Sequence, residues 1–265
     1  MKKRHLVYAI ALIVGMGACA ASAKKQAEAK PDVWKSYNVG TVLFEDKASE
    51  TKGSDIYHRI IPDAESYIKE QARTVLATLY NSPEDSITPV NKIHYTLEDI
   101  EGISAKGGGN GDVTIFYSTR HIEKSFAEND TAKLFFETRG VLLHELTHAY
   151  QLEPQGIGSY GTNRVFWAFI EGMADAVRVA NGGFDGPNAR PKGGNYMDGY
   201  RTAGYFFVWL RDNKDPEFLR KFNRSTLEVI PWSFDGAIKH ILGTAYNMDE
   251  LWHENQVALG DLQAQ

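Results

Sequence analysis

The chain has 265 residues, of which 43% are hydrophobic and 24% are charged. This composition is typical of a globular protein with a sizeable core, and it excludes disordered and fibrous chains. The formal net charge is −5 and no basic stripe is present, so we expect no nucleic-acid partner.

The N-terminus is predicted to be a targeting segment. Lys2, Lys3 and Arg4 precede an apolar stretch over residues 6–16, which is too short to span a bilayer comfortably. We assign residues 1–18 as a signal peptide, whose removal takes the net charge from −5 to −8. The mature protein is therefore expected to be exported and acidic.

Cys19 is the only cysteine, and it follows small residues at the end of the signal region. This position is similar to a bacterial lipoprotein cleavage site, where the thiol receives a lipid. We expect a lipid on Cys19 to be the only membrane attachment, in a bacterial envelope protein. Ordinary cleavage at an Ala-x-Ala site is the alternative, and it would give a periplasmic or secreted protein.

Residues 19–31, rich in Ala and Lys, are predicted to be a flexible tether. The remaining residues, 32–265, are predicted to form a single domain, with a cleft between a sheet lobe and a helical lobe. That domain has no cysteine, so we expect no disulfide in it.

The first half of this domain has a mixed pattern. Strands are predicted over residues 39–45, 92–97 and 112–118, which are rich in β-branched and aromatic residues. A helix is predicted over 62–80, with Pro62 at its first position. The glycine-rich segment 106–111 is predicted to be a mobile turn or loop.

The second half is predicted to be mostly helical, from apolar periodicity and capping residues. The fold class is therefore α+β, with a small mixed sheet in the N-terminal half packed on the first of these helices. The predicted helices cover residues 131–151, 163–180, 200–213, 235–242 and 248–259.

The segment His144-Glu145-Leu146-Thr147-His148 carries the first chemical signal. The two histidines are four residues apart on a predicted helix, so both rings project from one face and can bind one Zn²⁺. Glu145 lies next to the first ligand, where its carboxylate can accept a proton from an activated water. This pattern predicts a zinc metallopeptidase with one ion and Glu145 as general base.

A tetrahedral catalytic zinc site needs a third protein ligand. In one large class of zinc peptidases this ligand is a histidine six residues after the second, but Pro154 stands there. The next helix instead offers Glu171 and Asp175, one turn apart in an apolar segment, where a metal would compensate their burial. We predict Glu171 as the third ligand, and Asp175 as the acceptor for the outer N–H of a ligand histidine.

These segments resemble the basic secretory protein family of plants and bacteria. The resemblance rests on three motifs, at residues 140–151, 170–178 and 199–206, and more weakly on 61–80. It implies a zincin-like peptidase fold, with the third-ligand arrangement of thermolysin-like enzymes mapped onto Glu171 and Asp175. The family is named for basic proteins and this chain is acidic, so an inference about plant defence does not carry over.

An oxyanion donor other than zinc is also needed, and Tyr200 is the predicted one. A peptide or protein substrate is expected to add as a strand to an exposed sheet edge, at 92–97 or 112–118. The segment 106–111 is either a flap over that edge or a surface insertion. The alternative candidates for the oxyanion donor are Tyr160, Tyr196, Tyr205 and His253.

Two other functions are left open by the sequence. One is a lipid-anchored module that retains a zincin fold and binds a glycan or a protein without turnover. The other is a zinc amidase that acts on a cell-wall fragment. The intact Glu145 favours catalysis over simple binding.

Overall fold

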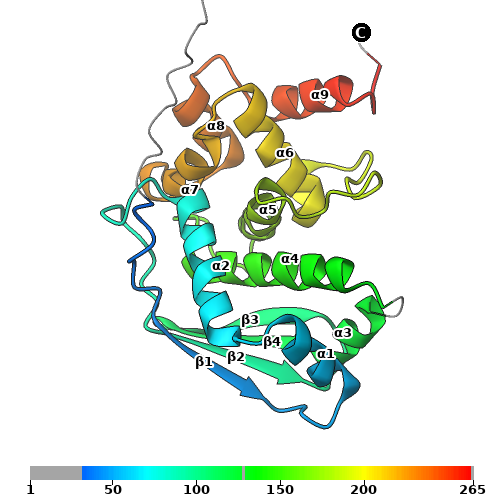
Figure 1. Cartoon of the computed structure of the whole chain (residues 1–265). Helices are drawn as coiled ribbons and strands as arrows, with labels where there is room; N and C mark the ends of the chain where they lie inside the picture. Colours follow the sequence, from blue (N-terminus) through cyan, green and yellow to red (C-terminus); the bar gives the residue numbers. More distant parts are fainter. Residues whose placement is uncertain (1–31, 127–128, 264–265) are drawn as a thin grey trace, which may run out of the picture. The chain divides into compact units, whose positions relative to one another are not determined.

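The structure is a computed structural model that describes residues 32–126 and 129–263 (Figure 1). From Val33 onward the chain forms one compact unit. The predicted signal peptide, the lipid site at Cys19 and the whole tether lie outside the described residues. Within the described part, no helix has the length and apolar character needed to cross a membrane.

One four-stranded sheet lies in the N-terminal half of the described chain, in the order β1-β2-β4-β3. Strand β2 pairs in parallel with β1 on one side and with β4 on the other, and β3 pairs antiparallel with β4. The three predicted strands are confirmed, with small shifts at their ends. The strand bounds are β1 Thr41–Asp46, β2 Lys92–Glu98, β3 Ser104–Gly109 and β4 Asp112–Ser118.

The prediction of a loop over 106–111 is wrong for its first four residues, which belong to β3. Glycine has a low strand propensity, but pairing with β4 supplies the backbone hydrogen bonds that hold this segment extended. Only Asn110 and Gly111 form the turn, both with positive φ. An Asn-Gly pair between two strands is a strong hairpin signal, and it was present in the sequence.

Both predicted substrate edges are also wrong, because β2 and β4 are interior strands. The edges of the described sheet are β1 and β3. Strand order depends on pairing between distant segments, so no local pattern could assign these edges.

All six predicted helices are confirmed: five in the second half of the chain and one in the first half. The helix predicted from Pro62 begins later, because the Asp63 side chain caps it by accepting from the Ser66 N–H. Three helices were not predicted: α1, α3 and α7. The helix bounds are α1 Lys52–Ile60, α2 Ala64–Leu79, α3 Thr119–Ser125, α4 Thr131–Tyr150, α5 Arg164–Ala180, α6 Tyr200–Asn213, α7 Phe218–Glu228, α8 Phe234–Leu242 and α9 Met248–Ala258.

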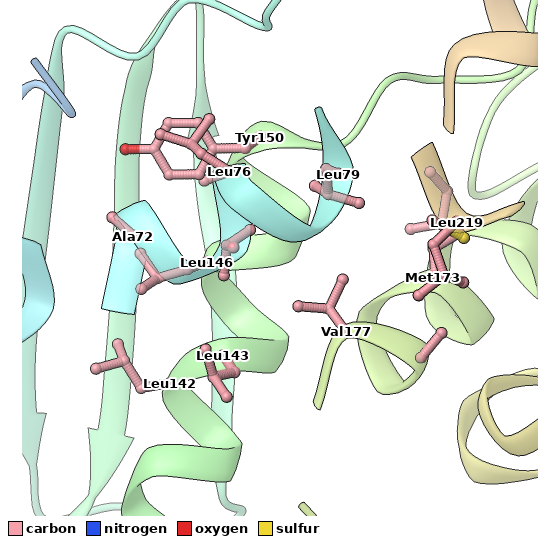
Figure 2. Packing of buried hydrophobic residues seen from close by; sticks show 14 of the residues in the cluster. Ala72, Leu76, Leu79, Leu142, Leu143, Leu146, Tyr150, Met173, Val177 and Leu219 are labelled. Atoms are coloured by element: carbon pink, nitrogen blue, oxygen red, sulfur yellow. The ribbon is translucent and has the colours of Figure 1, made fainter. Parts of the chain in front are cut away.

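Helix α4 lies along one face of the sheet, beside α2 (Figure 1). The Tyr117 hydroxyl of β4 lies 3.3 Å from Thr138 Oγ1 of α4, so this is the face that carries the buried residues of β4. Figure 2 shows Leu142 and Leu146 of α4 in the same apolar cluster as Leu76 of α2. Each buried leucine contributes about 1.5–3 kcal/mol, so this packing fixes the position of α4.

Helices α5 and α6 approach each other closely through two glycines. A Cβ on Gly172 would lie 2.7 Å from the Ala203 Cβ, and one on Gly204 would lie 2.9 Å from the Ala176 backbone nitrogen. These distances are too short for any larger side chain without a shift of one helix. The close contact fixes α5, which carries Glu171 and Asp175. The predicted α+β class is confirmed.

Candidate metal centre and active site

Helix α4 brings His144 and His148 together on one of its faces. Their ring centroids are 4.7 Å apart, and their Nε2 atoms are 3.1 Å apart. This geometry follows from the four-residue spacing, because one helical turn separates the two side chains. The rings project away from the leucines that anchor α4 to the sheet, into a cavity.

Helix α5 brings Glu171 to the same point. Its Oε2 lies 3.3 Å from His144 Nε2 and 3.7 Å from His148 Nε2, and the side chain is 5% exposed. This oxygen is buried and has no hydrogen-bond partner. Four ligands about 2.1 Å from one ion are about 3.4 Å from each other, so the spacing of these three atoms is compatible with a tetrahedral metal site. The three residues form a group that could hold a metal ion.

Each histidine has a second partner that orients its ring. His144 Nδ1 lies 2.7 Å from Asp175 Oδ1, as predicted for the outer N–H of a ligand. His148 Nδ1 lies 2.9 Å from the side-chain amide of Gln151, which is buried, and the Gln151 Oε1 has no partner. Sequence reasoning missed Gln151, although it stands one turn after His148 on the same helical face.

The two histidines differ strongly in proton affinity. Burial lowers the pKa of His144, but the hydrogen bond to Asp175 and the nearby Glu171 carboxylate outweigh it and raise this pKa to about 10. Burial and the charge of His144 together lower the pKa of His148 to about 3. Near neutral pH, His144 therefore carries an additional proton and is positively charged, whereas His148 is neutral. A metal ion must displace that proton.

The two glutamates also differ in proton affinity: the pKa of Glu145 is raised and that of Glu171 is lowered. Burial raises the pKa of the Glu145 carboxyl, although the charge of His144 and the nearby Ser104 side chain lower it in part. A raised pKa suits a general base that works near neutral pH. Burial would also raise the pKa of Glu171, but the protonated His144 and the Tyr160 hydroxyl help to outweigh it, so this pKa is lowered.

Two of the predicted tyrosine candidates lie at this site. The ring of Tyr200 is parallel to His144 within 15° at a centroid distance of 6.1 Å, and its backbone φ is +41°. A positive φ is strained for a bulky residue and is found where packing holds it in place. The Tyr160 hydroxyl donates to Glu171 Oε1 at 2.5 Å. Both phenols are nearly half exposed, at 47% and 46%.

The other three candidates lie elsewhere. The Tyr196 hydroxyl donates to Asp249, and the Tyr205 hydroxyl donates to the Phe184 carbonyl. His253 is exposed on α9. None of these three side chains lines the cavity in front of the histidines.

This cavity has a volume of about 670 Å³. Its floor is the His-His-Glu group, one wall is the edge strand β3, and Tyr160 and Tyr200 line another part. Glu145 faces β3, where the Lys106 backbone N–H donates to its carboxylate. The cavity thus has room for a ligand next to both the candidate metal position and the candidate base.

An α+β protein therefore brings two imidazoles and one carboxylate around a single point, with a buried glutamate beside them and a cavity in front. This arrangement defines a protein with a candidate metal site inside an enzyme-like pocket. The family model BSP, peptidase of plants and bacteria, matches residues 39–255, and the chain belongs to this family. The predicted membership in the basic secretory protein family is confirmed. No curated protein and no solved structure matches the chain.

Proposed function

We propose that this protein is a zinc-dependent peptide-bond hydrolase with a zincin-like fold. The observation that carries the proposal is the buried, unpartnered Oε2 of Glu171, aimed at the Nε2 atoms of His144 and His148. A buried carboxylate oxygen that makes no hydrogen bond is costly unless a cation compensates it; the protonated His144 does so here, and a bound metal ion would take over that role. Two nitrogens and one oxygen at these distances suit Zn²⁺.

When bound, the ion acts as a Lewis acid on the scissile carbonyl and lowers the pKa of a water molecule. Glu145 accepts the proton of the attacking water and delivers it to the leaving amine. Its raised pKa and its hydrogen bond from β3 position it for both transfers. Tyr200 is proposed to donate a hydrogen bond to the carbonyl oxygen as negative charge develops there, while Tyr160 holds Glu171.

The substrate is proposed to lie along β3, the sheet edge that borders the cavity. The outer backbone N–H and C=O groups of an edge strand are available to an extended peptide. The peptide would then pass between the edge strand and the His-His-Glu group, with its scissile bond next to Glu145.

The test is metal content and cleavage of an unfolded protein such as casein. We expect the wild type to bind about one zinc per chain and to cleave. The Glu145→Gln variant is expected to keep zinc and lose at least about a hundredfold in rate, as for loss of a general base. The Glu171→Ala variant is expected to lose both.

A wild type that binds no stoichiometric zinc would contradict the proposal. Zinc binding without peptide cleavage would favour a binding module or a cell-wall amidase, and cleavage of an acetylated muropeptide would identify the amidase.

We also propose that the protein is exported and anchored through a lipid on Cys19. The lone cysteine after the apolar segment supports this localisation.

A further inference from the structure

Lys106 is a half-buried lysine on the cavity wall. It stands opposite Ile115 in the β3–β4 pair, and Ile115 is buried on the α4 side of the sheet. Since side chains alternate between the two faces of a strand, Lys106 shares that face with Ser104. Lys106 is also among the residues that line the cavity.

The Lys106 ammonium group has no ion-pair partner among the described residues. The other cation on the cavity wall, Arg178, is already paired with Glu137 at 2.6 Å. A half-buried charge loses part of its hydration, and a bound anion would offset that loss. Glu153 is the other unpaired charge on the wall, but it is exposed, so it has little hydration to recover.

Lys106 also lies close to the proposed base Glu145 and to His148. Its backbone N–H donates to the Glu145 carboxylate, and its charge helps to lower the pKa of His148. The rest of β3 is Ser104, Ala105 and three glycines. Lys106 is therefore the one charged side chain that this strand offers to a peptide lying along it.

We propose that Lys106 selects peptide substrates with a carboxylate within one residue of the scissile bond. This inference rests on the proposed function. The carboxylate has two sources: an Asp or Glu side chain, or the C-terminal carboxylate of the substrate. Both would form the same ion pair with the Lys106 ammonium group.

The experiment uses zinc-loaded protein and peptides that differ only in charge. One pair has Gln or Glu next to the cleaved bond with an amidated C-terminus. A second pair has Gln at that position and either an amidated or a free C-terminus. The value of kcat/KM for each peptide is measured by mass spectrometry, for the wild type and for Lys106→Met, Lys106→Glu and Lys106→Arg.

We expect the wild type to cleave the carboxylate-bearing peptide about two- to fivefold faster in at least one pair, the size of a partly exposed ion pair. The pair that shows this advantage identifies the source of the carboxylate. The Lys106→Met variant should lose it, Lys106→Glu should reverse it and Lys106→Arg should keep it. High ionic strength should reduce it in the wild type. Lys69→Met on α2, remote from the cavity, is the matched control and should change nothing.

Equal cleavage of all peptides, or an unchanged preference in Lys106→Glu, would overturn the inference and leave the proposed function standing. If zinc-loaded wild type cleaves no peptide, the proposed function and this inference both fail. Equal zinc content in the variants shows whether the site is intact, and the Lys106→Arg variant separates loss of charge from loss of folding.

Discussion

At the scale of single residues, the site depends on which nitrogen of each histidine carries a proton. Ligation through Nε2 requires a hydrogen on Nδ1 and an acceptor for it. Asp175 is that acceptor for His144. For His148, Nδ1 lies 2.9 Å from the Gln151 amide, whose Oε1 has no hydrogen-bond partner among the described residues. An amide turned so that Oε1 faces Nδ1 satisfies both groups, because the two ends of an amide have the same shape.

This geometry predicts the effect of changing Gln151. The Gln151→Leu variant removes the acceptor and should weaken zinc affinity about 10–100-fold, whereas Gln151→Glu keeps an acceptor and should retain affinity within about threefold of the wild type. Competition with a chromogenic zinc chelator measures both. Gln155→Leu, at an exposed position, is the control. Equal losses in Gln151→Leu and Gln151→Glu would show that Gln151 does not act as an acceptor.

The proton on His144 predicts how zinc affinity depends on pH. The folded-state pKa of about 10 lies above the usual value, so His144 is protonated throughout the neutral range and the ion must displace this proton. Binding should therefore release about one proton at pH 7, and affinity should rise about tenfold per pH unit between pH 6 and 8. Calorimetry in buffers of different ionisation enthalpy counts the protons. Affinity that is independent of pH would contradict the assignment.

At the scale of secondary-structure elements, the site lies between helices α4 and α5. Different neighbouring elements hold each of these two helices in place. The α4 helix is fixed by its leucines against the sheet and α2. The α5 helix is fixed by the glycine contact with α6. Because the proposed ligands come from both helices, a small displacement of α5 moves Glu171 relative to the histidines.

Substitution of Gly172 tests this contact. Alanine is the better helix former by about 1 kcal/mol, but its Cβ would stand 2.7 Å from both Ala203 and Phe207. We expect Gly172→Ala to lower the free energy of unfolding by about 1–3 kcal/mol, and to weaken zinc affinity as α5 shifts. Urea unfolding measures the first effect. Gly186→Ala, where a Cβ would meet nothing within 4 Å, should be neutral. A stabilised Gly172→Ala would disprove close packing here.

At the scale of the whole described chain, a bound ion would connect the sheet-packed α4 to the helical second half through α5. Anything that binds only the folded state stabilises it in proportion to its occupancy. The metal is therefore expected to act on global stability as well as on catalysis.

Thermal unfolding with and without zinc tests this linkage. At a zinc concentration about 100 times the Kd, the stabilisation is about 2.7 kcal/mol, which corresponds to a rise in Tm of about 5–11 °C for a domain of this size. The Glu145→Gln variant should show the same rise, since that residue is not a proposed ligand. The Glu171→Ala variant should show almost none. An equal rise in Glu171→Ala would place the ion somewhere else.

The sequence by itself determined the helices that carry the site and most of the residues that meet in it, although Gln151 was missed. Caps and apolar periodicity are local signals, so α4, α5 and α6 were predicted almost to the residue. The four-residue spacing of the histidines fixed their common face in the same local way. Glu171 and Asp175 were identified because two carboxylates in an apolar helix need compensation.

Only the tertiary structure decided which strand borders the site and what each side chain contacts there. The edge position of β3, the contact of Glu145 with Lys106 and the hydrogen bond from Tyr160 to Glu171 all join segments that are distant in sequence. The same holds for the unpartnered oxygen of Glu171, which is visible only once α5 is placed against α4. Pairing and packing between distant segments depend on the whole fold, and no local pattern of residues encodes them.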